Sequence, residues 1–466
     1  MTVLGHARLF PAAAPADVFF RLAQRAGVFW LDSSLTRPDD GRYSIMGCEP
    51  RWVFVAAGQA WRIERDGRPI EQGTVGSLAK IEELLAAHRV VPSSSPDLPF
   101  WGGAVGWFSY DLGRQFESVE ESASADVFTP DIRLAWHDAA IIWDHRAAQT
   151  WLVGADGERP AEVAMRELAA WSEAPSPEVE IARTPQKCGL ATSDLQRESY
   201  LAKVQEIRAS IARGEVYQAN LTQRFACTFC DEPSAIYLRL RELNPAPFAL
   251  YQAAGGTVVL SSSPERFLEV SPHGHIRTCP IKGTRPRGRT PEEDQVQREE
   301  LMTSAKERAE LLMIVDLLRN DLGRVCEFGS IKVPRLHSLE SFATVHHLVG
   351  EVTGQLRPEV GLGGLLRAVF PGGSITGAPK VAALRLIERL EPHRRGIGMG
   401  ALGYVSAHGR IDLNVAIRTI ICRDGRAYFH LGAGIVWDSD PAAEYEETLV
   451  KGRALFEALG VEADRS

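Results

Sequence analysis

The chain has 466 residues, of which 45% are hydrophobic and 24% charged, and its formal net charge is -8. This composition is that of a globular protein and excludes extended disorder, while the net acidity and the lack of a basic tract exclude a nucleic-acid surface. No run approaches about eighteen uninterrupted apolar residues and the N-terminal apolar segment is too short for a secretory signal, so we expect no membrane span and a cytoplasmic protein.

Residues 1–171 form the first region of the chain. Strand-like runs occupy residues 51–57, 60–65 and 138–145, and residues 77–89 follow a helical pattern. Short strands that alternate with helices predict an antiparallel sheet covered by helices.

Residues 172–189 are the best candidate for a linker, because Pro, Ser and charged residues interrupt the periodic pattern there. Residues 190–466 would form a second region, and we expect the two regions to make one interlocked globule. The seven cysteines are scattered, and Cys227 and Cys230 form a CxxC without a second ligand pair for zinc. We therefore expect thiols rather than a zinc site or disulfides.

Two helices of the second region have clear predicted starts. Thr290 as N-cap, Pro291 at the first position and Glu293 at the third form a capping box, and the helix is expected to run to about Leu322. The last helix is predicted to begin after Asp440 and to continue to a terminal glycine at position 460.

Each of these helices carries two glutamates three residues apart. Glu307 and Glu310 share one face, and Glu444 and Glu447 share another, with Lys451 four residues further on. If the faces meet, four carboxylates converge, and a cation is needed to offset their charge. Oxygen ligands without histidine or thiolate suit Mg²⁺ or Ca²⁺. Two separate solvated faces remain the alternative.

Two glycine-rich turns could approach a ligand. FPGGSITGAPKV at residues 370–381 lacks the Gly-Lys-Ser/Thr of a nucleotide-binding loop, but it leads into a helix whose first N–H groups could hold a carboxylate. LGAGIVWD at residues 431–438 ends a predicted strand, where glycines permit close approach or a bulge. Arg418 lies in a preceding apolar strand, so its guanidinium should face a carboxylate of the protein or of a substrate.

Lys282, in PIKGTRPRG at residues 280–288, follows a strand-like segment and has three interpretations. It could be a surface lysine, an anion-binding charge, or an amine made nucleophilic by burial, which disfavours ammonium. His346 and His347 are adjacent in a predicted strand and should point to opposite faces, so only one of them can line a given pocket.

Eight segments in order resemble the chorismate-utilising enzymes over about residues 195–455. They are GEVYQANLTQRF, SSSPERF, PIKGTRPRG, RAELLMIVDLLRNDLGRV, VHHLV, FPGGSITGAPK, LGAGI and EYEETLVK. The resemblance implies an α+β fold in which two mixed or antiparallel sheets pack face to face with helices outside, a four-layer α/β/β/α arrangement like that of anthranilate synthase component I.

The resemblance also implies roles for individual residues. Lys282 would be the nucleophile, as in the aminodeoxychorismate synthase branch of the family, where anthranilate synthases carry alanine. Glu265 would be the general acid, and Gln218 replaces the lysine base of isochorismate synthases. Mg²⁺ would be held by Glu310 and Glu447, with Glu307 and Glu444 acting through water. The residues implied to line the substrate are His347, Thr284, Ser374, Arg418, Gly432, Gly434 and Lys451.

The implied reaction is amination of chorismate at C4 to 4-amino-4-deoxychorismate, a step toward p-aminobenzoate and folate, through a covalent adduct on lysine. Ammonia would come from a separate glutamine amidotransferase, since the chain shows no nucleophilic cysteine elbow. The alternatives are an anthranilate synthase component I, and an inactive tryptophan-binding regulatory subunit.

Two further positions bear on the resemblance. Gly398 stands where the family usually has an aromatic residue near the enolpyruvyl carboxylate, so Arg418 or another aromatic would take over that contact. Ser33, in FWLDSSL, resembles an element that lines a tryptophan pocket in relatives, and it is a candidate effector contact; a strand end is the alternative explanation.

Overall fold

The computed structural model describes residues 3–37, 40–92, 97–175, 184–341 and 345–465. Within these ranges the strands form two sheets, of 14 and 12 strands, and most neighbouring strands are antiparallel. The expected linker at residues 172–189 includes residues 176–183, which lie outside the described ranges.

The first sheet runs in the order β26 (Glu462–Ala463), β12 (Leu190–Ser193), β13 (Gln218–Thr228), β25 (Arg426–Ile435), β24 (Thr419–Arg423), β15 (Thr257–Ser263), β14 (Phe248–Ala254), β2 (Phe29–Asp32), β3 (Tyr43–Gly47), β10 (Ala139–Asp144), β11 (Gln149–Ala155), β1 (Val3–Leu9) and β7 (Val90–Pro92), with β21 (Gly377–Ala378) paired to β13. The second runs in the order β18 (Ile281–Pro286), β20 (Val345–Gln355), β17 (His275–Thr278), β16 (Arg266–Val270), β23 (Ile411–Val415), β22 (Ala401–Ser406), β8 (Gly103–Phe108), β9 (Ile132–His137), β4 (Trp52–Ala57), β5 (Ala60–Arg65) and β6 (Arg68–Gly73), with β19 (Lys332–Ser341) paired to β20.

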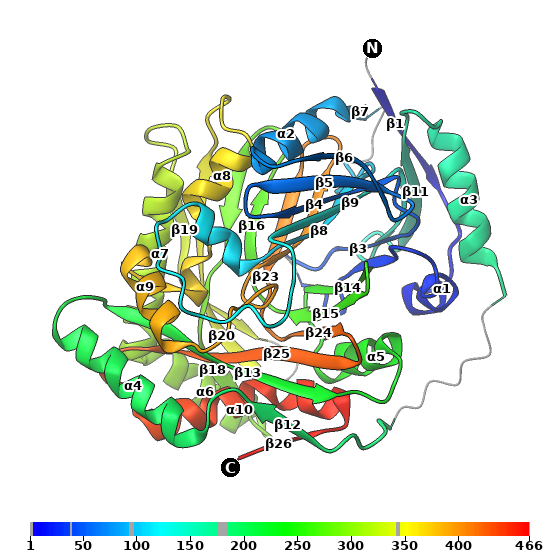
Figure 1. The fold of residues 1–466 in the computed structure, drawn as a ribbon. Helices are drawn as coiled ribbons and strands as arrows, with labels where there is room; N and C mark the ends of the chain where they lie inside the picture. The colour runs from blue at the N-terminus through cyan, green and yellow to red at the C-terminus, as the bar shows by residue number, and fades with distance from the viewer. Residues whose placement is uncertain (1–2, 38–39, 93–96, 176–183, 342–344, 466) are drawn as a thin grey trace.

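Helices pack against the outer faces of the sheets (Figure 1). Those on the first sheet are α1 (Pro15–Leu22), α3 (Ala161–Glu173), α4 (Arg197–Ala212), α5 (Pro233–Leu243), α9 (Lys380–Leu390) and α10 (Pro441–Leu459). Those on the second are α2 (Ser77–Ala87), α6 (Pro291–Thr303), α7 (Ala305–Gly323) and α8 (Leu362–Val369). Two short 3-10 turns, η1 (Tyr110–Gln115) and η2 (Gly373–Ile375), complete the described elements.

The inner faces of the two sheets meet in apolar clusters. In one of them Leu250 and Ile421 of the first sheet are buried together with Trp107 and Leu402 of the second. Burial of apolar side chains at about 25 cal/mol per Å² is the main force that holds such layers together. The α+β fold of two face-to-face sheets with helices outside is therefore confirmed.

Each sheet takes strands from both sides of residues 172–189. β2 pairs with β14 in the first sheet, and β8 pairs with β22 in the second. The close contact of β8 with β9 requires Gly106, because a Cβ there would overlap the carbonyl oxygen of Arg133. Distant parts of the sequence are thus hydrogen-bonded neighbours in the middle of both sheets.

Local capping fixes the predicted helix starts. The Thr290 side chain accepts a hydrogen bond from the Glu293 N–H, and the Asp440 side chain caps α10, which ends at Gly460 in the left-handed region. The single helix expected over residues 290–322 is wrong, because Ser304 is extended and its hydroxyl caps the N–H of Glu307. α6 therefore ends at Thr303, and α7 begins anew at Ala305.

Two other features concern the cysteines and the surface. Cys188 and Cys230 form a disulfide, which contradicts the expectation that all cysteines are thiols; the two are 42 residues apart, so no local pattern marks the pair.

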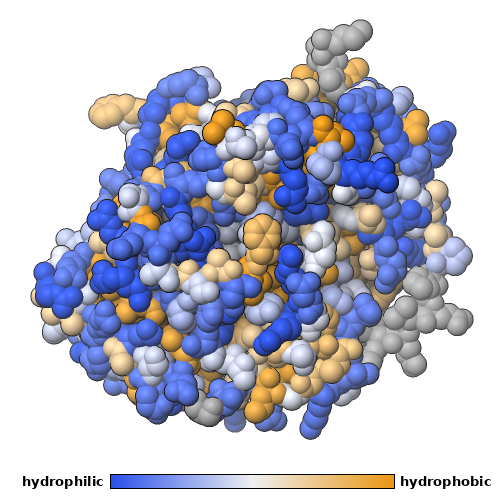
Figure 2. All heavy atoms as spheres, in the orientation of Figure 1, coloured by the Kyte–Doolittle hydropathy of each residue, from blue (hydrophilic) through white to orange (hydrophobic). Residues whose placement is uncertain are grey.

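None of the helices in the described ranges is long and apolar enough to span a membrane. Figure 2 shows polar side chains over most of one face, with apolar residues scattered among them, as on ordinary protein surfaces.

Candidate active site

The predicted site residues come from the ends of both sheets and from two helices. Strands β13 and β25 belong to the first sheet and β18 and β20 to the second, while α7 packs on β18 and β20 and α10 packs on β25. In Figure 1 these strands lie in the lower half of the molecule. The elements that carry the candidate residues therefore adjoin one another.

Lys282 lies in β18 beside a bulge, where the pairing with β20 shifts between Lys282 and Thr284. Gly283 makes this bulge possible, since its φ of +69° is in the left-handed region and a Cβ there would lie 2.7 Å from Leu301 Cδ1. The half-buried Lys282 amine donates a hydrogen bond to the backbone carbonyl of Ser374 in η2, at 3.3 Å. It does not project into bulk water as a free surface lysine would.

Glu265 lies between β15 and β16 and is only 5% exposed. Burial raises the pKa of its carboxyl group to about 7, although a hydrogen bond from the Ser374 side chain and the positive charge of Lys282 act in the opposite direction. A carboxylic acid that titrates near neutrality can donate a proton to a leaving group at physiological pH. Ser374 contacts both Glu265 and Lys282, so the acid and the amine lie close together.

The backbone of β25 approaches Lys282 closely. A Cβ on Gly434 would lie 3.4 Å from the Lys282 amine and would overlap the side-chain nitrogen of Gln218. Gln218 is buried, and its carbonyl oxygen has no hydrogen-bond partner among the described residues. A buried acceptor without a donor is costly, so a ligand or water that donates to it would be stabilised.

His347 and Thr284 are paired across β20 and β18. The ring Nδ1 of His347 lies 3.0 Å from the Thr284 hydroxyl and 3.2 Å from the Gly283 carbonyl oxygen. Burial, followed by the positive charge of Arg418, lowers the pKa of His347 to about 3. This histidine is a neutral hydrogen-bonding group near neutral pH, while His346 instead contacts Ser341 and Asp294.

Arg418 occupies a turn between β23 and β24 rather than a strand, and its φ of +50° is unusual for a residue with a side chain. Its guanidinium donates a hydrogen bond to the Asn244 side chain at 3.0 Å. Burial lowers its pKa to about 10, and no carboxylate of the described residues forms an ion pair with it. The expected carboxylate is thus not a protein group, which leaves a buried cation available for an anionic ligand.

The four glutamates of α7 and α10 lie at one place, as their spacing predicts if the helix faces meet. Lys306 bridges the helices, with its amine 4.0 Å from Glu310 and 3.8 Å from Glu444. Burial raises the pKa of both carboxyls, and their glutamate neighbours Glu307 and Glu447 add to the shifts. The positive charges of Lys282, Lys306 and Lys451 act in the opposite direction, so lysines of the protein offset part of the negative charge of this cluster.

Lys451 neutralises the exposed end of this cluster. Its amine lies 2.7 Å from Glu447 and donates a hydrogen bond to the Gly432 carbonyl at 3.2 Å. Burial opposes ionisation of Glu447, but Lys451 outweighs it and lowers the pKa of Glu447. On the opposite side, Glu307 lies 3.5 Å from Arg285.

The donor set fits a divalent cation in its chemistry. It consists of carboxylates from two helices, with raised pKa values at Glu310 and Glu444 that a cation would reverse. In the part of the chain that the structure describes, no three acidic, histidine or cysteine side chains are already arranged around one point as metal ligands. Lys306 lies between two of the carboxylates instead.

Two residues near the site were missed by the sequence reasoning. Asn244, which holds Arg418, is 174 positions away and no sequence pattern connects the two. Lys306 is four residues before Glu310, and this spacing could have indicated their contact. The space beside Gly398 is also filled, because a Cβ there would lie 2.5 Å from the ring of His430. The ring of His430 in β25 therefore occupies the space beside this glycine.

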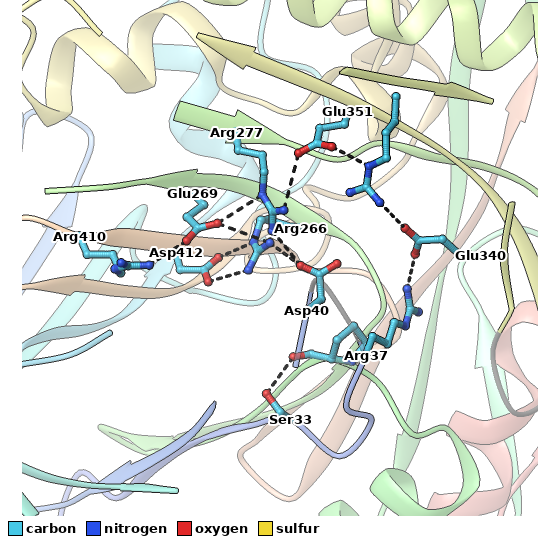
Figure 3. Close-up of polar contacts among 12 residues, drawn as sticks. Ser33, Arg37, Asp40, Arg266, Glu269, Arg277, Glu340, Glu351, Arg410 and Asp412 are labelled. Carbon is cyan, nitrogen blue, oxygen red and sulfur yellow. Dashed lines mark hydrogen bonds and ion pairs between the residues drawn. The ribbon is translucent and has the colours of Figure 1, made fainter. Parts of the chain in front are cut away.

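Ser33 follows β2 at the edge of a different cavity, of about 220 Å³. Its hydroxyl donates a hydrogen bond to the Tyr43 carbonyl at 2.6 Å, and Tyr43 and Pro247 also line the cavity. Lys282 is not among the lining residues. Figure 3 shows the ion pairs that extend from one wall of this cavity, which involve Arg37, Asp40, Arg266, Glu269, Arg277, Glu340, Glu351, Arg410 and Asp412.

The chain belongs to the family of chorismate binding enzymes, whose model matches residues 35–457. It is 40% identical over 445 residues to aminodeoxychorismate synthase component 1 of Klebsiella aerogenes, covering 95% of this chain and 96% of that one. It is 36% identical to anthranilate synthase component 1 of Aquifex aeolicus, and the alignment covers 97% of this chain and 93% of that one. Its fold is similar to the crystal structure of anthranilate synthase component I from Streptococcus pneumoniae TIGR4, with a TM-score of 0.77, 30% identity and 90% and 92% coverage.

Proposed function

We propose that this chain aminates chorismate at C4, with Lys282 as a covalent nucleophile, to give 4-amino-4-deoxychorismate. The observation that carries the proposal is the Lys282 amine beside the buried carboxyl of Glu265, both in contact with Ser374. The aminodeoxychorismate synthases among the relatives support the choice of reaction.

The reaction is an allylic substitution in two stages. The Lys282 amine adds to C2 of the ring, both conjugated double bonds of the ring shift, and the C4–O bond breaks while Glu265 donates a proton so that water leaves. Glu265 then regains a proton from the nitrogen of the adduct. Ammonia adds to C4, both double bonds shift back, and the C2–N bond breaks as Glu265 donates a proton to the lysine nitrogen. Glu265 then regains a proton from the new ammonium group, which restores Lys282 and releases the product.

The remaining residues bind and orient the substrate. Arg418 receives the enolpyruvyl carboxylate, because its buried charge has no carboxylate partner among the described residues. Thr284 and His347 line the ring as uncharged hydrogen-bonding groups, and the β25 backbone at Gly432 and Gly434 lies against the other carboxylate. Residues that hold the substrate in a fixed position lower the entropic part of the activation barrier.

Mg²⁺ is the proposed cofactor. Glu310 and Glu447 would hold it, with Glu307 and Glu444 acting through water, and the bound ion would neutralise the ring carboxylate. The carboxylates of both helices lie near enough to share the amine of Lys306, which supports their joint role.

Two partners are part of the proposal. A glutamine amidotransferase subunit would supply ammonia, as the designation "component 1" of the relatives suggests. The cavity beside Ser33 would be the place for tryptophan if the chain binds that effector.

The second candidate is an anthranilate synthase component, which some relatives at 35–39% identity support. Lys282 argues against it, since anthranilate synthases typically carry alanine at that position. The test is to incubate the purified chain with chorismate, Mg²⁺ and ammonium, and to identify the product by mass while pyruvate is measured. 4-Amino-4-deoxychorismate without pyruvate supports the proposal, whereas anthranilate with stoichiometric pyruvate overturns it.

A further inference from the structure

The amine of Lys306 occupies the place where positive charge is most needed between α7 and α10. It lies 4.0 Å from Glu310 on its own helix and 3.8 Å from Glu444 on the other. Both carboxyls are largely buried, with side-chain exposures of 12% and 7%. Two such carboxylates repel each other, and the charge of Lys306 reduces this repulsion.

Lys306 differs from Lys451, the other lysine of the cluster. Lys451 is held by two short contacts, to Glu447 and to the Gly432 carbonyl. Lys306 makes two long contacts, and its side chain is 46% exposed. An amine on a long, half-exposed side chain can move into water at small cost, because its charge remains hydrated there.

We propose that Lys306 is a resident counter-cation, which keeps the glutamates of α7 and α10 together in the metal-free protein and moves away when a divalent cation binds. This inference depends on the metal site of the proposed function. The amine and a divalent ion would share the Glu310 carboxylate and would both lie beside Glu444, so the two positive charges would repel each other. Lys306 therefore competes with the metal and weakens its affinity.

This role differs from that of a simple structural ion pair. If Lys306 only joined the helices, its loss would disorganise the carboxylates and weaken metal binding. If it competes with the metal, its loss destabilises the metal-free protein but strengthens metal binding. The sign of the change in metal affinity thus separates the two roles.

The test is titration calorimetry of Mg²⁺ and Mn²⁺ into the full chain without chorismate, for the wild type, Lys306→Gln and Lys306→Arg. We expect Lys306→Gln to bind either ion about three- to tenfold more tightly, as removal of one nearby positive charge in a solvated site predicts. Lys306→Arg keeps the charge and should bind within about twofold of the wild type. The control is Lys203→Gln in α4, a lysine without an ion pair among the described residues.

Thermal melting in a chelator provides the second measurement. Lys306→Gln should melt below the wild type without metal and recover with saturating Mg²⁺, while Lys203→Gln should not change. Unchanged or weaker metal binding by Lys306→Gln would overturn the inference. If the wild type still binds Mn²⁺ at a site that Glu310→Gln abolishes, unchanged or weaker binding by Lys306→Gln would refute only the competing role of Lys306. No binding by any variant would refute the proposed metal site as well.

Discussion

Replacement of Arg418 by methionine should have opposite effects on catalysis and on stability. Arg418 is half-buried, its guanidinium donates a hydrogen bond to the Asn244 side chain, and desolvation lowers its pKa to about 10. The charge is therefore unfavourable in the free enzyme and becomes favourable once a substrate carboxylate is bound. Methionine replaces the unbranched part of the side chain and leaves the backbone strain at φ +50° unchanged, so the substitution removes mainly the guanidinium group.

The magnitudes follow from the contacts. Loss of one partner of a buried, hydrogen-bonded charge pair costs about 2–5 kcal/mol, so kcat/KM for chorismate should fall by about 30- to 4,000-fold. A basic group whose pKa is lower in the folded state than in the unfolded state destabilises the fold at neutral pH. Its removal should therefore raise the free energy of unfolding by about 1–3 kcal/mol. The lost hydrogen bond to Asn244 offsets about 1 kcal/mol of that gain. The melting temperature should therefore be equal to or above that of the wild type.

The assay combines steady-state kinetics with thermal melting, and Arg239→Met is the matched control. Arg239 is more buried than the half-buried Arg418 and forms an ion pair with Asp231 at 2.6 Å. That control should melt at a lower temperature and keep kcat/KM near the wild-type value. A large loss of stability in Arg418→Met, or an unchanged kcat/KM, would refute the assignment of Arg418 to a substrate carboxylate.

Three further predictions concern Glu265, Gly434 and α10. Glu265 must be protonated to act as an acid, and burial raises its pKa to about 7, so kcat/KM for chorismate should fall as pH rises through about 7. Glu265→Gln should lose this pH dependence together with most activity, and a persistent transition would exclude Glu265 as the acid. The same raised pKa means that the free energy of unfolding falls as pH rises from 4.5 to about 7, a slope that chemical denaturation should find reduced in Glu265→Gln. Gly434→Ala should displace Gln218 and crowd Lys282, and should lower kcat about a hundredfold. The control is Gly323→Ala, which should have normal kinetics because its new Cβ would lie 3.7 Å from the nearest atom. Glu444→Gln should raise the Mg²⁺ concentration needed for half-maximal activity, and an unchanged requirement would place the metal elsewhere.

Features set by local interactions could be predicted from the sequence. The starts at Thr290 and Asp440 depend on one side chain that bonds to an N–H three residues later, so a few residues determine them. The break at Ser304 has the same kind of signal, since Ser304 and Glu307 have the spacing of a capping box. Helical periodicity over residues 290–322 hid this signal, because a capped interruption hardly changes the pattern of apolar residues.

Features set by long-range contacts could not be predicted. The contact of Arg418 with Asn244 and the disulfide between Cys188 and Cys230 join positions far apart in the chain, and neither has a local pattern. The glutamate pairs show the intermediate case, in which spacing predicts the face of each helix but not that the two faces meet. The roles of Lys282 and Glu265 came from the family resemblance, and the burial of Glu265 supplies a physical reason for its role.

The most direct test of the central claim is a search for the covalent adduct on Lys282. The protein would be mixed with chorismate and Mg²⁺ without ammonia, quenched, and analysed by intact mass and peptide mapping. We expect a mass increase equal to chorismate less one water, located on Lys282, removed by later addition of ammonium and absent from Lys282→Ala. Full amination activity in Lys282→Ala, or an adduct on another residue of the wild type, would contradict it.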